Sequence, residues 1–91
     1  MYEITNYTYK QAKKLGVSVK TSTNKTKKID VYKNGKKIAS VGANGMNDFP
    51  TYIKKRGLKY AKTRRRLYKN RHESDRHVIW SSVWLADKLL W

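Results

Sequence analysis

The pattern of apolar and polar positions is clearest on either side of Asn34-Gly35, where apolar residues alternate with polar ones. Asn-Gly between two such runs is the strongest short hairpin signal, because both residues tolerate the positive φ angles of a tight turn. We therefore predict two antiparallel strands, Lys28–Lys33 and Lys36–Val41. The two-residue turn sets the register of facing residues: Lys33 with Lys36, Tyr32 with Lys37, and Val31 with Ile38.

In that register one face of the hairpin is apolar and is predicted to be buried, comprising Ile29, Val31 and Ile38. The opposite face carries Asp30, Tyr32, Lys37 and Ala39. The lysines that face each other at the tip repel one another, which indicates either a bound anion or a well-hydrated turn.

The segment before the hairpin is predicted to contain a short helix. Residues 1–7 are expected to form a short strand or an ordered arm. Thr8 and Gln11 have the spacing of a capping box, which predicts a helix over about residues 9–15 with Gly16 as its C-cap. The β-branched run at 17–21 predicts a strand, and the Ser/Thr/Asn/Lys run at 22–27 predicts a loop.

The segment after the hairpin has helical spacing. Asp48 and Pro50 predict the start of a helix over about 50–56, which Gly57 ends or kinks. A basic helix is predicted over about 58–72, a strand or extended segment over 77–80, and a last helix over 83–90, capped by Ser81 or Ser82. The aromatic residues expected to anchor the core are Trp80, Trp84 and Trp91.

Together these elements predict an α+β fold in a single domain of residues 1–91. A small antiparallel sheet with a β-hairpin is expected to pack against C-terminal helices. Residues 1–45 contribute the short helix and the hairpin, and residues 46–91 contribute the basic helix and the Trp-rich C-terminus.

The charge of the chain is extreme for its length. Its 91 residues include 22 Lys and Arg against 6 Asp and Glu, a net charge of +16. Self-repulsion on that scale indicates an anionic partner, such as nucleic acid, an anionic membrane or an acidic protein surface. The absence of cysteine excludes disulfides and thiolate metal sites. No apolar run approaches the roughly 18 residues of a membrane span, and the N-terminus lacks a signal-peptide layout, so we expect a soluble protein that is not secreted.

The positive charge is concentrated between Lys54 and Arg71, a run without any acidic residue. On a helix, Leu58, Ala61 and Tyr68 fall on one side, and Tyr60 and Leu67 flank them. The opposite side carries a row of cations, Lys55, Lys59, Lys62, Arg66 and Lys69. The pattern predicts one apolar stripe for docking and one cationic stripe for a polyanion.

Phosphate groups are the expected ligands of this row. Lysine and arginine gain affinity for phosphates through counterion release, which needs no sequence code, and arginine can contact a phosphate bidentately. The predicted nucleic-acid-binding or polyanion-binding residues are Lys36, Lys37, Lys55, Lys59, Lys62, Arg64, Arg65, Arg66, Lys69 and Arg71. No helix-turn-helix signature accompanies them, so sequence-tolerant binding is expected.

A second cluster, Arg71–His77, holds two histidines and two acidic residues. His72 and His77 are five residues apart, roughly 140° around a helix, so they diverge rather than meet at one metal ion. Glu73 and Asp75 are instead expected to pair with neighbouring arginines, and titration of either histidine could tune the affinity for an anion. No nucleophile elbow or recognisable carboxylate pair is present. We therefore expect no enzymatic activity, no catalytic residue, no metal and no cofactor.

Several short motifs resemble a family of short, basic, functionally uncharacterised proteins encoded by large DNA viruses of algae and amoebae and by some large phages. The resemblance covers most of the chain and is carried by Phe49-Pro50-Thr51-Tyr52, the block from Tyr60-Ala61-Lys62 to Tyr68-Lys69, Arg71-His72, Asp75-Arg76, Ala86-Asp87-Lys88, Trp91, Val19-Lys20 and the hairpin. The family has a Gly-rich turn and paired tyrosines before Ala-Asp-Lys, where this chain has Trp80–Leu85.

This resemblance implies a viral context, in the virion or the infected host cell, and brings no established active site. The first hypothesis is therefore a sequence-tolerant nucleic-acid-binding protein associated with the virion. The alternative is a minor capsid or cement protein whose basic face docks on acidic capsid proteins or on a membrane. A nuclease is a distant third hypothesis. Neither the anionic partner nor the oligomeric state follows from the sequence.

Overall fold

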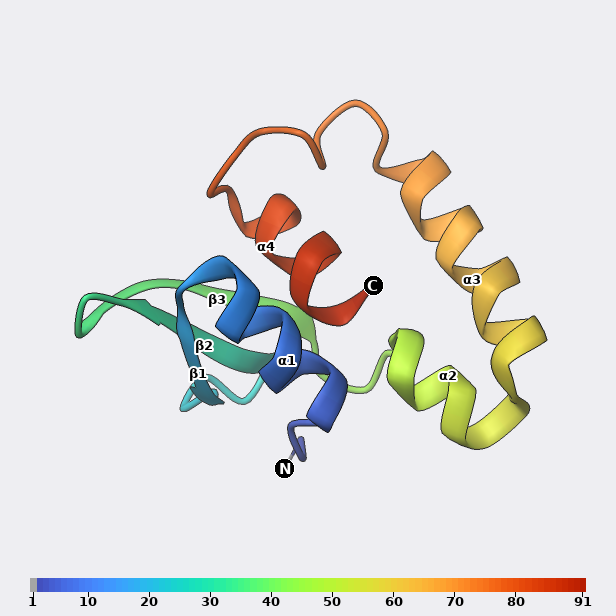
Figure 1. Ribbon diagram of the computed structural model, residues 1–91, viewed down its shortest axis with the longest axis horizontal. Helices are drawn as coiled ribbons and strands as arrows, with labels where there is room; N and C mark the ends of the chain where they lie inside the picture. Colours follow the sequence, from blue (N-terminus) through green and yellow to red (C-terminus); the bar gives the residue numbers. More distant parts are fainter. Residues whose placement is uncertain (1) are drawn as a thin grey trace. The chain divides into compact units, whose positions relative to one another are not determined.

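The hairpin predicted at Asn34-Gly35 is present in the computed structural model, which describes residues 2–91 (Figure 1). Strands β2 (Lys27–Lys33) and β3 (Lys36–Ala43) are antiparallel. Asn34 and Gly35 have φ angles of 54° and 77°, as a tight turn of this kind requires. The predicted pairs at the tip, Lys33 with Lys36 and Tyr32 with Lys37, are confirmed.

The register changes beyond the tip because β3 contains a bulge. Val31 faces Ala39 rather than Ile38, so Ile38 is an extra residue without a partner in the register. The predicted pairing of Val31 with Ile38 and the predicted burial of Ile38 are therefore wrong. Ile38 is 39% exposed, and Val41, which faces Ile29, is the buried residue of β3.

The sheet has three strands, because β1 (Ser18–Thr21) pairs with the free edge of β2. The order β1-β2-β3 makes β2 the central strand. Ile29 and Val31 on one face of β2 are fully buried, and Lys28 and Asp30 on the other face are buried as well. The central strand is therefore covered on both faces, and its polar side chains need partners inside the protein.

Helix α1 (Asn6–Leu15) begins earlier than the sequence predicts. The N-cap is Thr5, whose hydroxyl accepts a hydrogen bond from the backbone N–H of Thr8 at 3.3 Å, and Thr8 itself is buried inside the helix. Gly16 ends the helix with a φ angle of 74°, as predicted. Residues 2–5 are irregular and Tyr7 is helical, so of the two alternatives expected for residues 1–7, a strand or an ordered arm, the strand is wrong for the described residues; Met1 lies outside them.

The C-terminal half is helical, and its helix starts agree with the sequence signals. Helix α2 (Phe49–Arg56) has Asp48 as its N-cap, and helix α4 (Ser82–Leu90) has Ser81. Gly57 separates α2 from α3 (Leu58–Arg71) at the bend visible in Figure 1. Its φ of 88° and ψ of 166° lie in a region that is essentially restricted to glycine.

Two predictions for the C-terminal half are wrong. Residues 77–80 form turns rather than a strand or an extended segment. The buried apolar side chains of α4 are Leu85, Leu89 and Leu90, whereas Trp80 is 38% exposed. Leucines rather than tryptophans therefore form the most deeply buried part of this helix.

The α+β class is confirmed, with a small antiparallel sheet built on a hairpin and with helices in the C-terminal half. The chain divides into two compact units, the first ending at Met46 and the second comprising Asn47–Trp91. The first contains α1 and the sheet, and the second contains α2, α3 and α4. Within the part of the chain described, no helix has the length and apolar character needed to cross a membrane.

Candidate polyanion-binding surface

Two of the predicted phosphate-binding arginines lie against aromatic rings of α2. The Arg65 guanidinium carbon is 3.5 Å from the centroid of the Phe49 ring, and that of Arg64 is 5.6 Å from the centroid of Tyr52. Both Nε atoms are buried without a hydrogen-bond partner. Arginine stacks readily on aromatic faces, because its planar cation is weakly hydrated. These two side chains therefore connect α3 to α2.

Lys69 is directed toward a buried acid. Its Nζ lies 2.8 Å from Oδ1 of Asp87, whose side chain is 1% exposed. Nη1 of Arg76 lies 3.7 Å from the other carboxylate oxygen. A buried carboxylate is costly unless paired, so Lys69 and Arg76 compensate its charge inside the second unit.

Three predicted cations of α3 are exposed, and their side chains make no hydrogen bond, ion pair or ring contact to the described part of the chain: Lys59, Lys62 and Arg66. With 100° between successive residues, these positions span only about 60° around the helix. We call them the outer face of α3. Ala61 and Tyr68 lie on the opposite side, where Ala61 is fully buried.

Two further predicted residues border this helix. Lys55 is exposed on α2, with its Nζ 3.4 Å from Oδ1 of Asn47. Arg71 is exposed at the end of α3, with its guanidinium carbon 5.9 Å from the centroid of the Tyr68 ring. Both keep their charge at the surface, so they can add to the field of the outer face.

The predicted hairpin residues Lys36 and Lys37 belong to the first unit, and both are exposed. Nζ of Lys37 lies 3.5 Å from Oδ2 of Asp30. The side chain of Lys36 makes no hydrogen bond, ion pair or ring contact within residues 2–91.

The cluster at 72–77 is held together by ion pairs. Glu73 accepts hydrogen bonds from Nε and Nη2 of Arg76, at 3.1 and 2.9 Å, and its other oxygen lies 2.9 Å from Nε2 of His77. These contacts, with His77 first and Arg76 second, lower the pKa of Glu73. His72 pairs separately with Asp75 at 3.4 Å. Across residues 2–91, no three potential metal ligands come together.

An aromatic chain lies between α2, α3 and the C-terminal residue. Trp91 stacks on Tyr68 with centroids 4.4 Å apart and approaches Tyr52 at 6.1 Å, and Tyr52 approaches Tyr60 at 5.6 Å. Burial, followed by the negative charge of Asp87, raises the pKa of Tyr68 to about 12. The tyrosine is therefore a neutral packing residue at physiological pH.

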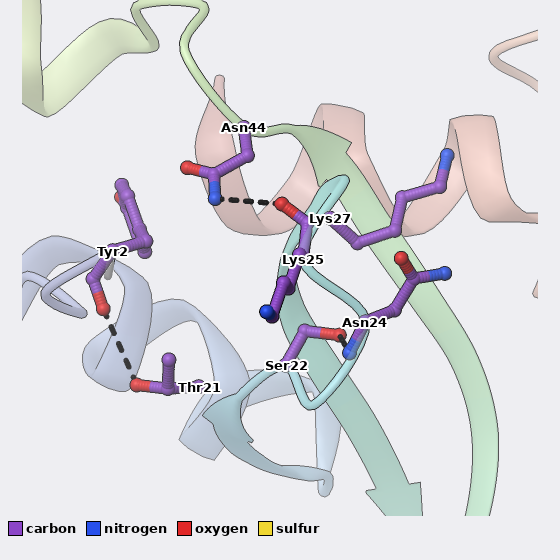
Figure 2. A pocket seen from close by; sticks show the side chains of 7 residues that line it. All are labelled: Tyr2, Thr21, Ser22, Asn24, Lys25, Lys27 and Asn44. Atoms are coloured by element: carbon purple, nitrogen blue, oxygen red, sulfur yellow. Dashed lines mark hydrogen bonds between the residues drawn. The ribbon is translucent and has the colours of Figure 1, made fainter.

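A pocket of about 330 Å³ in the first unit was not predicted from the sequence. It is lined by Tyr2, Thr21, Ser22, Asn24, Lys25, Lys27 and Asn44 (Figure 2). The sequence identifies residues 22–27 as a polar loop, but nothing in it brings Tyr2 and Asn44 to that loop. They meet there because Thr21 donates a hydrogen bond to the carbonyl of Tyr2 at 3.3 Å and Asn44 donates one to the carbonyl of Lys25 at 2.9 Å.

An exposed apolar segment precedes α4. Val78 and Ile79 are 60% and 67% exposed, and the neighbouring Trp80 has a positive φ angle of 68°, which is unusual for a bulky residue. The Trp80 ring lies 5.0 Å from that of Trp84. Contiguous exposed apolar residues are typical of contact surfaces.

Comparison of the chain with protein-family models, with curated proteins and with solved structures gives no match. The site must therefore be interpreted from its own chemistry.

Proposed function

We propose that this protein binds nucleic acid with little regard to sequence, by contacting backbone phosphates through the outer face of α3. The observation that carries the proposal is that the side chains of Lys59, Lys62 and Arg66 are exposed on one side of a helix and have no partner among residues 2–91, in a chain of net charge +16. Unpaired surface cations in a row are suited to a repeating row of phosphates.

The dimensions of the outer face fit this role. Lys59 and Arg66 are seven residues apart, about 10 Å along the helix axis, and Lys62 lies between them. Phosphates follow one another within this distance along a nucleic-acid strand. Thr63 and Asn70, which fall on the same side, are short polar residues of the kind that contact sugar and phosphate.

The test uses fluorescence anisotropy with duplex DNA of two unrelated sequences over a salt series. Changing Lys59, Lys62 and Arg66 together to Gln should reduce the slope of log affinity against log salt by about 3, since each phosphate contact contributes roughly 0.9. Both sequences should lose affinity alike. Glutamine keeps helix propensity similar, so α3 should stay folded.

A matched control is available on α1. Lys10, Lys13 and Lys14 are also exposed, and changing them to Gln removes the same charge from a different element. This control should alter the slope much less. Equal losses in the two triple variants would contradict the proposal, because only net charge would then matter.

Arg64 and Arg65 are left out of the test variant. Removing them would also remove the ring contacts between α2 and α3, so a loss of binding could reflect a loss of structure.

A second candidate, docking of a minor capsid or cement protein on acidic capsid proteins, is favoured by the exposed segment Val78-Ile79-Trp80. The viral context of both candidates rests on the resemblance described above. Including an acidic polypeptide in the same salt series separates them. Tight binding to the polypeptide with weak, salt-insensitive binding to DNA would favour the capsid role.

A further inference from the structure

The pocket of the first unit has the chemistry of a nucleotide site. Lysines 25 and 27 bring positive charge, Tyr2 brings an aromatic ring, and Asn24 and Asn44 bring amides. No acidic side chain lines it. Its volume of about 330 Å³ lies within the range of small-ligand clefts, which begins near 300 Å³. An anionic ligand with a flat ring and hydrogen-bonding edges fits this set best.

Each asparagine uses one end of its amide to hold the loop and leaves the other end available. Oδ1 of Asn24 accepts hydrogen bonds from the backbone N–H and the hydroxyl of Thr26, at 3.0 and 2.8 Å. Nδ2 of Asn44 donates to the carbonyl of Lys25. The Asn24 donor and the Asn44 acceptor have no partner among the described residues. An available acceptor on a fixed side chain, such as Oδ1 of Asn44, suits the edge of a base.

The Tyr2 ring, which supplies the aromatic part of the pocket, is held in place by two contacts. Nζ of Lys28, on the buried face of the central strand, lies 5.0 Å from the centroid of the Tyr2 ring, and the Tyr2 carbonyl accepts the hydrogen bond from Thr21. A ring held in this way loses little conformational freedom when a base stacks on it.

The two lysines of the loop extend in different directions. Figure 2 shows the Lys25 ammonium and the Asn44 oxygen on the side of the loop where Tyr2 lies, whereas Lys27 and Asn24 extend to the other side. Neither lysine makes an ion pair within residues 2–91. Two unpaired cations on opposite sides of one loop can contact successive phosphates of a strand that crosses it.

We infer that this pocket binds one unpaired nucleotide of a single-stranded nucleic acid, with its base on Tyr2 and its flanking phosphates on Lys25 and Lys27. The inference rests on the proposed nucleic-acid binding and adds to it a preference for single-stranded over duplex nucleic acid. A base inside a duplex is stacked and paired and cannot enter such a pocket, whereas an unpaired base can.

The test compares a single-stranded oligonucleotide with a duplex of the same length for Tyr2→Leu, Lys25→Gln and the wild type. Tyr2→Leu should weaken single-strand binding roughly fivefold or more relative to duplex binding, which corresponds to the loss of one stacked base. Tyr2→Phe keeps the ring and should retain the preference. Lys25→Gln should also lower the ratio of single-strand to duplex affinity, and it leaves the ring in place if Tyr2→Leu fails to fold.

A second experiment, by NMR spectroscopy, tests directly where the ligand binds. In ¹H–¹⁵N spectra of the full chain, a nucleoside 5′-monophosphate should shift the backbone amides of residues 21–27 and 44. Inorganic phosphate is the comparison probe. Equal shifts from phosphate alone would overturn the base-binding part and leave an anion site.

The two proposals fail separately. An unchanged ratio of single-strand to duplex affinity in both Tyr2→Leu and Lys25→Gln overturns the pocket, even when the outer-face variant loses affinity for both ligands. The opposite result overturns the proposed role of α3: Tyr2→Leu and Lys25→Gln lower the ratio of single-strand to duplex affinity, but the triple Gln variant of the outer face binds both ligands as the wild type does.

Discussion

The carboxylate of Asp30 is buried in the central strand, yet it accepts hydrogen bonds from several donors and lies near a lysine. The Ser40 and Ser22 hydroxyls donate hydrogen bonds to Oδ1 at 2.6 and 2.7 Å, and Lys37 lies 3.5 Å from Oδ2. These contacts, with Ser40 first and Ser22 second, outweigh the cost of burial and lower the pKa of Asp30 from 3.8 to about 2.

The lowered pKa of Asp30 predicts a pH dependence of stability. A carboxyl whose pKa is lower in the folded state stabilises the fold above its unfolded pKa and loses that contribution as the pH falls through its folded pKa. Asp30 should thus contribute about 2 kcal/mol at pH 7, lost between about pH 4 and pH 2. Urea unfolding of Asp30→Asn and the wild type measures it: the difference should be present at pH 7 and shrink in acid. A difference independent of pH would contradict this assignment.

At the residue scale, the direction of a side chain was the least predictable property. The sequence indicates alternation in the hairpin correctly up to Lys37, but a bulge leaves no local signal, so the exposure of Ile38 was missed. Likewise, the position of a charge on a helix does not show whether it faces water. Arg64 and Arg65 face rings that come from another helix.

At the element scale, helix boundaries were predictable wherever one residue carries the signal. The side chains of Asp48 and Ser81 accept hydrogen bonds from backbone N–H groups three residues later, and Gly16 closes α1. These signals are local and therefore visible in the sequence. The start of α1 was missed because Thr5 and Thr8 are equally good caps by chemistry, and only the burial of Thr8 distinguishes them.

The junction between α2 and α3 depends on Gly57, which follows one helix and precedes the other. A Cβ at this position would meet no atom within 4 Å, so the cost of a substitution arises from the backbone angle alone. Gly57→Ala should lower the free energy of unfolding by about 1–3 kcal/mol, measured by denaturant titration.

Leu58→Ala is the appropriate control for this junction. Leu58 is the next residue, it is 50% exposed and its backbone is helical, so its replacement should cost much less. Equal costs for the two variants would show that the junction is sensitive to side chains rather than to backbone conformation.

At the scale of the whole molecule, the cations are shared between both units, ten in residues 1–46 and twelve in residues 47–91. The cations within each unit therefore repel one another, and they also repel any neighbouring molecule of the same charge. Total charge was predictable from composition, but which cations remain available was not, because that depends on acids such as Asp87 that lie far away in the sequence.

This charge predicts that salt stabilises the protein in the absence of a partner. Raising NaCl from about 0.02 M to about 0.3 M shortens the Debye length from roughly 20 Å to roughly 6 Å and weakens the repulsion between exposed cations. The melting temperature should rise over this range, as measured by circular dichroism. The variant with Lys10, Lys13 and Lys14 changed to Gln should respond less. A melting temperature that falls with salt would show that ion pairs outweigh repulsion.

The different positions of lysine and arginine in the second unit have a consequence for covalent modification. Acetyl transfer neutralises lysine ammonium groups and leaves guanidinium groups unchanged. Lys59 and Lys62 are exposed to such a reagent, whereas the cations that lie over Phe49 and Tyr52 are arginines. Acetylation of the two lysines would therefore remove two of the three charges of the outer face and leave only Arg66, while the contacts between α2 and α3 persist, so that weaker binding to a polyanion requires no unfolding.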